Sequence, residues 1–118
     1  MSLETADKEA AAHAVKPRVT LADIEAAIER SFYFTGSEAA YNFDDRTPDA
    51  PSSRSLETLT ICLVVMRNGF TIIGKSAPAS PKNFDAEFGR KLAYEDAIRQ
   101  LWPLMGFALR DRLAFGPH

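Results

Sequence analysis

One stretch of the sequence has the glycine spacing of a phosphate-binding loop. Residues 69–76 contain two glycines separated by four residues, and Lys75 and Ser76 follow the second glycine. In nucleotide-binding proteins such a loop wraps its backbone amides around a phosphate and leads into a helix. Here the spacer is bulky and β-branched, and Ala77-Pro78 follows in place of a helix. We therefore interpret residues 69–76 as a turn and a β-strand.

The other residue types that carry out chemistry are few and poorly placed for it. His13 lies near the N-terminus and His118 is the last residue, so neither is expected to be held as a general base or metal ligand. Cys62 is the only cysteine, and its apolar neighbours favour a buried structural role over a reactive thiolate. The acidic residues of one predicted helix are scattered around its axis: Asp85, Glu87, Glu95 and Asp96. We predict that the protein is not an enzyme and that it has no cofactor and no bound metal.

Five basic residues are candidates for a binding surface. They come from the predicted hairpin, the loop after it and the predicted second helix: Lys75, Lys82, Arg90, Lys91 and Arg99. If they lay on one face, they would line a groove for nucleic acid or a nucleotide. The net charge of −2 does not by itself indicate such a partner. Nucleic-acid or nucleotide binding is therefore an alternative function.

The composition is that of one folded domain. The chain has 118 residues, of which 46% are hydrophobic and 25% charged. Residues 1–18 are expected to form a disordered arm, and residues 19–118 a single domain with a long loop at about 37–55. No apolar run reaches the roughly 18 residues that a membrane helix needs, and the N-terminus does not resemble a secretion signal. We therefore expect a cytoplasmic protein.

The predicted fold class is α+β: a helix, an antiparallel β-hairpin, a second helix and a C-terminal helical tail. Thr20 and Asp23 form an approximate capping box for the first helix, which is expected to end near residues 33–36. Asn68-Gly69 predicts a two-residue turn between strands 56–66 and 70–76. That register places five apolar side chains on one face: Leu59, Ile61, Leu63, Val65 and Ile72. A third strand, if one is present, is expected at 39–43.

The second helix is predicted to have two different apolar sides. It is expected from about Asp85 to Trp102, and residues 104–115 form a further helix or a kinked continuation after Pro103. The small-residue side suits close packing on the sheet: Gly89, Ala93 and Ala97. The bulky side contains the candidate self-association residues: Phe88, Leu92, Ile98 and Trp102. The first helix, the C-terminal segment or a second copy of the chain would cover this bulky side.

Many spaced residues within 59–113 form a recognisable pattern. Its clearest positions are those that we regard as structural: Asn68, Gly69, Phe70, Gly74, Asn83, Phe84, Gly89 and Trp102. It also contains Ser80-Pro81, Ala93, Ala97, Pro103-Leu104, Gly106 and Leu109-Arg110. This pattern resembles the phage gene product forty-nine/sixty-six family, small proteins of tailed phages and prophages, and 20–24 is similar to the family's opening helix. An acidic residue is common in the family where this chain has Met105.

The resemblance implies a phage or prophage origin and little chemistry, because the family has no assigned biochemical function. We expect a phage-encoded accessory protein in the cytoplasm of a bacterial host cell. Its preferred function is non-enzymatic binding to a host protein, in a host-takeover or anti-defence role. We also expect it to form a homo-oligomer, a dimer or higher, and to have no membrane partner.

Overall fold

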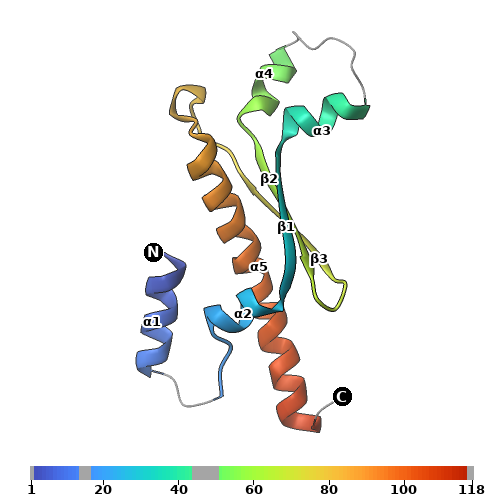
Figure 1. Ribbon diagram of the computed structural model, residues 1–118. Coiled ribbons are helices and arrows are strands. Elements are labelled where there is room, and N and C mark those ends of the chain that lie inside the picture. Colours follow the sequence, from blue (N-terminus) through green and yellow to red (C-terminus); the bar gives the residue numbers. More distant parts are fainter. Residues whose placement is uncertain (1, 14–16, 44–50, 117–118) are drawn as a thin grey trace.

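The computed structural model describes residues 2–13, 17–43 and 51–116 (Figure 1). Three antiparallel strands form a sheet in the order β1-β2-β3, and α5 packs against β2 and β3. This arrangement confirms the predicted α+β fold. In chain order the elements are α1 (Leu3–His13), α2 (Leu21–Ala27), β1 (Ile28–Thr35), α3 (Gly36–Phe43), α4 (Pro51–Glu57), β2 (Thr60–Met66), β3 (Thr71–Ser76), the 3-10 turn η1 (Pro81–Asn83) and α5 (Ala86–Phe115).

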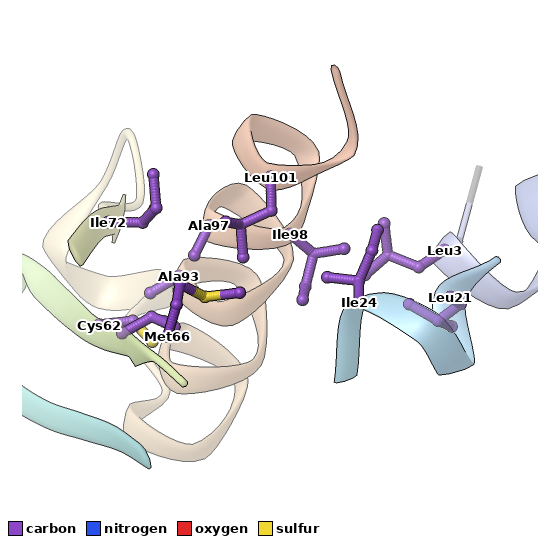
Figure 2. Close-up of a cluster of buried hydrophobic side chains, with 11 residues drawn as sticks. Leu3, Leu21, Ile24, Cys62, Met66, Ile72, Ala93, Ala97, Ile98 and Leu101 are labelled. Carbon is purple, nitrogen blue, oxygen red and sulfur yellow. The ribbon is translucent and has the colours of Figure 1, made fainter. Parts of the chain in front are cut away.

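The N-terminal segment is a helix where we expected a disordered arm. Leu3 of α1 is buried in the core cluster with Ile24 of α2 (Figure 2). A carboxylate oxygen of Asp7 accepts hydrogen bonds from the Arg18 guanidinium at 2.9 Å and from the backbone N–H of Leu21 at 3.2 Å. These contacts tie α1 to the start of α2, so the prediction was wrong for residues 3–13; residues 14–16 lie outside the described part. Sequence composition missed α1 because one apolar side chain and one ion pair hold it.

The first predicted helix is shorter than expected, because its second half is a strand. The capping box is confirmed: the Thr20 hydroxyl accepts from the Asp23 amide at 3.0 Å, and the Asp23 carboxylate accepts from the Thr20 amide at 2.9 Å. The helix ends at Ala27, and the aromatic run that follows has a typical strand composition. In β1 this run gains a hydrogen-bonded ladder with β2. The prediction of a helix to residues 33–36 was therefore wrong.

Two short helices replace most of the predicted loop at 37–55. α3 covers residues 36–43, so the prediction of a third strand at 39–43 was also wrong; the third strand is β1. The Thr35 hydroxyl accepts from the Glu38 amide at 3.0 Å, and the Glu38 carboxylate accepts from the Thr35 amide at 3.0 Å, which caps α3. Residues 44–50 of the predicted loop lie outside the described part. Both helices lie at one end of the sheet (Figure 1).

The hairpin between β2 and β3 has three loop residues, and this changes which side chains of the two strands share a face. The Met66 amide donates to the Phe70 carbonyl at 2.8 Å, and the Gly69 amide donates to the Met66 carbonyl at 2.9 Å. Gly69 is left-handed, with φ +89°, as in a three-residue turn with a bulge. The pairing is therefore Leu63 with Ile73, and not Leu63 with Gly74 as predicted. Because side chains alternate along a strand, the face buried under α5 carries Thr60, Cys62, Val64, Met66 and Ile72.

α5 is one helix of 30 residues that passes through Pro103 without ending. The Asp85 carboxylate caps its start by accepting from the Phe88 amide at 3.0 Å. Pro103 is on an exposed side, where water can hydrate the carbonyl that proline leaves without a donor. The predicted continuation is confirmed, and the predicted end at Trp102 was wrong.

Small residues allow α5 to lie close to the sheet. A Cβ atom on Gly74 of β3 would overlap the carbonyl oxygen of Ala93 and lie 2.8 Å from the Ala97 amide nitrogen. A Cβ atom on Gly89 would lie 2.7 Å from the Thr60 hydroxyl. The prediction that the small-residue side packs on the domain's own sheet is therefore confirmed.

The molecule is elongated because α5 runs beyond the sheet (Figure 1). Its principal extents are 55 × 30 × 16 Å. Its radius of gyration of 17.5 Å exceeds the roughly 13–14 Å of a compact domain of this length. Of the helices in the described part, none combines the length and the apolar character needed to span a membrane.

Candidate functional site

The five predicted basic residues do not share one groove. Lys75 is on β3, one edge of the sheet, whereas Arg90 lies beside Tyr33 and Phe34 of β1, the opposite edge. Arg99 is about half exposed and lies 4.0 Å from the Glu95 carboxylate.

The other two basic residues have separate surroundings. Lys82 is exposed in η1, and Lys91 lies near the acidic residues Asp85 and Glu87 at the start of α5. The five basic residues are divided among three elements and are partly neutralised. They therefore do not form a groove for a polyanion.

The segment that matched a phosphate-binding pattern is a hairpin loop and a straight strand. The backbone amide of Lys75 donates to the Asp96 carboxylate at 3.0 Å, and the Ile73 carbonyl accepts from the Gln100 amide group at 2.8 Å. A negative group therefore already occupies the amide that a phosphate would need. The strand interpretation of residues 71–76 is confirmed.

The potentially reactive side chains of the described residues lie in surroundings that indicate a structural role. Cys62 is fully buried, and burial raises the pKa of its thiol, which disfavours the nucleophilic thiolate. Burial also raises the pKa of its cross-strand neighbour Tyr33 to about 12. Among residues 2–13, 17–43 and 51–116, no three His, Cys, Asp or Glu side chains gather as metal ligands. His13 is exposed in the last turn of α1, and His118 lies outside the described residues.

The bulky side of α5 divides into a covered half and an exposed half. Ile98 is fully buried and faces Ile24 of α2 (Figure 2). The indole N–H of Trp102 donates to the Val19 carbonyl at 3.2 Å, so the start of the first helix covers both residues. The alternative that the first predicted helix covers this side is confirmed for Ile98, which is therefore not available for self-association. Trp102 is only partly buried, and its role in self-association stays a prediction.

The exposed half of that side borders a pocket at the start of α5. Phe88 is 54% exposed, and together with Phe84 and Leu92 it lines a hollow of about 280 Å³ against the loop that leaves β3. Asn83 and Gly89 also line it. The pocket walls are thus mainly apolar.

The remaining structural positions of the sequence pattern act in the hairpin. The Asn68 side-chain oxygen accepts from the Phe70 amide at 3.0 Å, which holds the loop closed. Gly69 supplies the left-handed conformation that this loop needs. Phe70 is 54% exposed at the hairpin end.

A further feature is the sheet face that points away from α5, which we name the open sheet face. The register places Phe32 of β1, Leu63 of β2 and Ile73 of β3 side by side in one row across all three strands. Phe32 is 38% exposed and Ile73 61% exposed, although both are large and apolar. None of the helices in the described ranges packs over this row: α5 is on the opposite face, and α3 and α4 lie at the sheet end (Figure 1).

The rows on either side of this apolar row add positive charge. Arg30 and Thr71 flank Val65 on one side, and Phe34 and Lys75 flank Ile61 on the other. The Arg30 guanidinium lies 4.6 Å from the centre of the Phe32 ring, a cation–π contact. The open sheet face is thus an apolar strip with a cation at two opposite corners and no acidic residue in these rows.

Sequence reasoning missed this face because the predicted register was shifted by one residue. The predicted register grouped Leu63 with Ile72 on one apolar face, whereas Leu63 pairs with Ile73 on the face that points away from α5. The available signal was that both alternating sets of β2 residues are apolar. A sheet that is apolar on both faces usually has both faces covered.

A family profile matches most of the chain. It is the profile of the Phage protein (N4 Gp49/phage Sf6 gene 66) family, and it matches residues 19–113. The matched segment includes all three strands and nearly all of α5. Searches of curated proteins and of solved structures returned no match.

Proposed function

Because the chain belongs to the Phage protein (N4 Gp49/phage Sf6 gene 66) family, it is a phage protein, and we propose that it is a non-enzymatic binding module that acts on a host protein. It meets this protein in the cytoplasm of the infected cell and binds it through the open sheet face. The observation that carries the proposal is the uncovered row of Phe32, Leu63 and Ile73.

The energetics of this row favour a protein partner. Burying a large apolar side chain contributes about 1.5–3 kcal/mol, and three adjacent side chains form a contiguous patch of the kind that marks interaction sites. Aromatic residues and arginine are enriched in the residues that dominate binding energy, and Phe32 and Arg30 are already stacked. Their contact restricts both side chains before the partner arrives, which lowers the entropic cost of binding.

The charges at the corners indicate the chemistry of the partner surface. Arg30 and Lys75 would repel a basic partner and attract an acidic one. The proposed partner therefore presents an apolar patch bordered by carboxylates. The same two cations are too far apart in the register, and too few, to follow a nucleic-acid backbone.

The test is affinity capture from nuclease-treated host lysate with matched variants. Ile73→Glu introduces a charge into the centre of the open sheet face at an exposed position, so the fold is expected to persist. Leu113→Glu introduces the same charge at a comparably exposed apolar residue of α5, away from the open sheet face. We expect one host protein to be captured by the wild type and by Leu113→Glu, and to be lost with Ile73→Glu.

Two outcomes would contradict the proposal. Equal capture by Ile73→Glu would show that the open sheet face is not the contact. Recovery of nucleic acid from a parallel untreated lysate, with no protein captured after nuclease treatment, would favour the alternative of nucleic-acid binding.

A further inference from the structure

The second half of α5 presents an apolar stripe that has no sheet beneath it. In the first half of the helix, Ala93, Ala97 and Leu101 recur every four residues on the side that contacts β2 and β3. The same side continues at the three- and four-residue spacing that keeps residues on one helical face. Its later apolar members are Leu104, Phe107, Ala108 and Phe115, which we name the C-terminal stripe; Asp111 lies on the same side among them.

The C-terminal stripe is exposed to an unusual degree for its residue types. Leu104 is 46% exposed, Phe107 74% and Phe115 79%. This part of α5 lies past the sheet and forms one end of the elongated molecule (Figure 1). Where α5 lies closest to the sheet its residues are small, as at Gly89, Ala93 and Ala97, whereas those of the stripe are mostly large. Large side chains hold a packing partner further from the helix axis than small ones do. The part of α5 beyond the sheet is therefore suited to a partner other than the sheet.

The stripe carries both a hollow and the side chain that would fill it. A depression of about 220 Å³ lies between the hairpin and α5 and is lined by Met66, Asn68, Phe70, Leu101, Leu104, Met105 and Ala108. A cavity of about 150 Å³ accommodates benzene, so this one can take a phenylalanine ring. Phe115 projects from the same side of α5, three helical turns further on, about 16 Å from Leu104 along the axis.

We infer that this stripe is the contact between two copies of the chain, paired antiparallel about a two-fold axis. With the axis centred between Ala108 and Asp111, Phe115 of each copy lies opposite Leu104 of the other. Each Phe115 ring then enters the hollow beside Leu104, and the small side chain of Ala108 lets the helices approach near the axis. A two-fold pair satisfies both copies with one arrangement, because the same patch serves as both partners.

The exposed area is large enough for such a pair. Aromatic side chains bury about 150–250 Å² each, so the exposed parts of Leu104, Phe107 and Phe115 amount to roughly 400 Å². Phe70, which borders the hollow and is half exposed, enlarges the patch further. Stable interfaces bury about 800 Å² per partner, of which this apolar centre supplies half or more.

The self-association surface is thus distinct from the Phe88 side predicted from sequence and from the open sheet face. The inference does not rest on the proposed host partner, since it concerns the purified protein alone. It also leaves the open sheet face accessible in each copy.

The experiment is sedimentation equilibrium of the full chain at micromolar concentrations, with matched variants. Phe107→Gln and Phe115→Gln remove rings from the stripe, whereas Leu113→Gln makes a comparable change on another side of the same helix, at a residue that is 59% exposed. We expect a wild-type dimer and a dimer of Leu113→Gln. We expect each stripe variant to raise the dissociation constant by about 30-fold, as is typical of an interface hot spot. Circular dichroism verifies that each variant remains helical.

Three results would overturn the inference. The first is a monomeric wild type, and the second is a dimer that Phe107→Gln and Phe115→Gln leave unchanged. The third is a dimer lost with Phe88→Gln or Ile73→Glu but kept in the stripe variants, which would place the contact at the α5 pocket or on the open sheet face. Loss of the dimer without loss of lysate capture would separate this inference from the proposed function.

Discussion

Gly74 of β3 lies directly against the backbone of Ala93 in α5, so that no side chain fits between the strand and the helix. This contact fixes how closely α5 approaches the sheet. It also fixes which sheet face is buried, and therefore which face remains open.

Replacing Gly74 with alanine is expected to destabilise the fold strongly. The new Cβ would overlap the Ala93 carbonyl and approach the Ala97 amide at 2.8 Å, and backbone atoms cannot rotate aside as side chains do. We expect a loss of at least about 2–3 kcal/mol in the free energy of unfolding, measured by chemical denaturation. The control is Gly106→Ala on α5, where a Cβ meets no atom within 4 Å. That change should stabilise by about 0.5–1 kcal/mol. An unchanged Gly74→Ala stability would contradict the close packing of α5 on β3.

Sequence patterns identified the elements near Gly74 well and their register poorly. The small-residue side of α5 and the hairpin at Asn68-Gly69 were both predictable, because glycine and alanine spacing and turn residues are local signals. The register was not, because Asn68-Gly69 fits both a two-residue loop and the last two positions of a three-residue loop. One residue of difference reverses the faces of β3 relative to β2. The open sheet face could therefore be found only from the structure.

The N-terminal half was predicted less well, because long-range contacts decide its structure. The aromatic residues of β1 fit the same helical periodicity that α2 starts, and only the ladder with β2 selects the strand. Leu3 gains its burial from α2 and the core, which no local composition reveals. The Phe88 side of α5 looked uniform in sequence. In the structure α2 covers Ile98, and the Val19 carbonyl just before α2 accepts from Trp102, whereas Phe88 is exposed.

The hairpin loop is expected to depend on the left-handed backbone of Gly69. Nothing lies within 4 Å of a Cβ at this position, so the effect of Gly69→Val comes from backbone strain alone. We expect it to cost about 1–3 kcal/mol and to lower the thermal midpoint. Asparagine adopts the left-handed region more readily, so Gly69→Asn should retain most of the stability. Equal midpoints for the valine variant and the wild type would exclude this loop geometry.

The hydrogen bond from Trp102 to the Val19 carbonyl should hold the start of α2 against α5. Trp102→Phe removes the indole donor and leaves the part-buried Val19 carbonyl without this partner. We expect the free energy of unfolding to fall by about 1–2 kcal/mol, as measured by circular dichroism in a denaturant titration. Tyr94→Phe, which removes an exposed 3.3 Å hydrogen bond to Glu25, is the control and should cost less. A larger loss for Tyr94→Phe would mean that the roles of the two contacts are reversed.

The docking of α1 is expected to weaken in acid. The hydrogen bond from Arg18 lowers the pKa of Asp7 below its usual 3.8, and the backbone amide of Leu21 adds to this. A carboxyl group whose folded pKa is lowered stabilises the fold above its unfolded pKa and loses that contribution as the pH falls through the folded value. The loss therefore begins near pH 4 and continues below it. Asp23 acts in the same direction, because the Thr20 amide lowers its pKa.

Hydrogen exchange of the α1 amides across this pH range measures the effect. The wild type should lose protection of α1 below about pH 4, relative to α5, after correction for intrinsic exchange. In Asp7→Asn the α1 amides should be less protected at neutral pH, and their protection should depend less on pH. If α1 in the wild type were equally protected at pH 3 and pH 6, Asp7 would not anchor it.

The central claim, that the open sheet face binds a host protein, is tested most directly by titrating the captured and purified host protein into the phage protein by calorimetry. Ile73→Glu should weaken the affinity by about 30-fold or more, because it places a charge within the buried apolar row. Leu113→Glu, which places the same charge on α5 away from this face, should change it by less than about threefold. The same affinity for Ile73→Glu and the wild type, with both proteins folded, would contradict the claim.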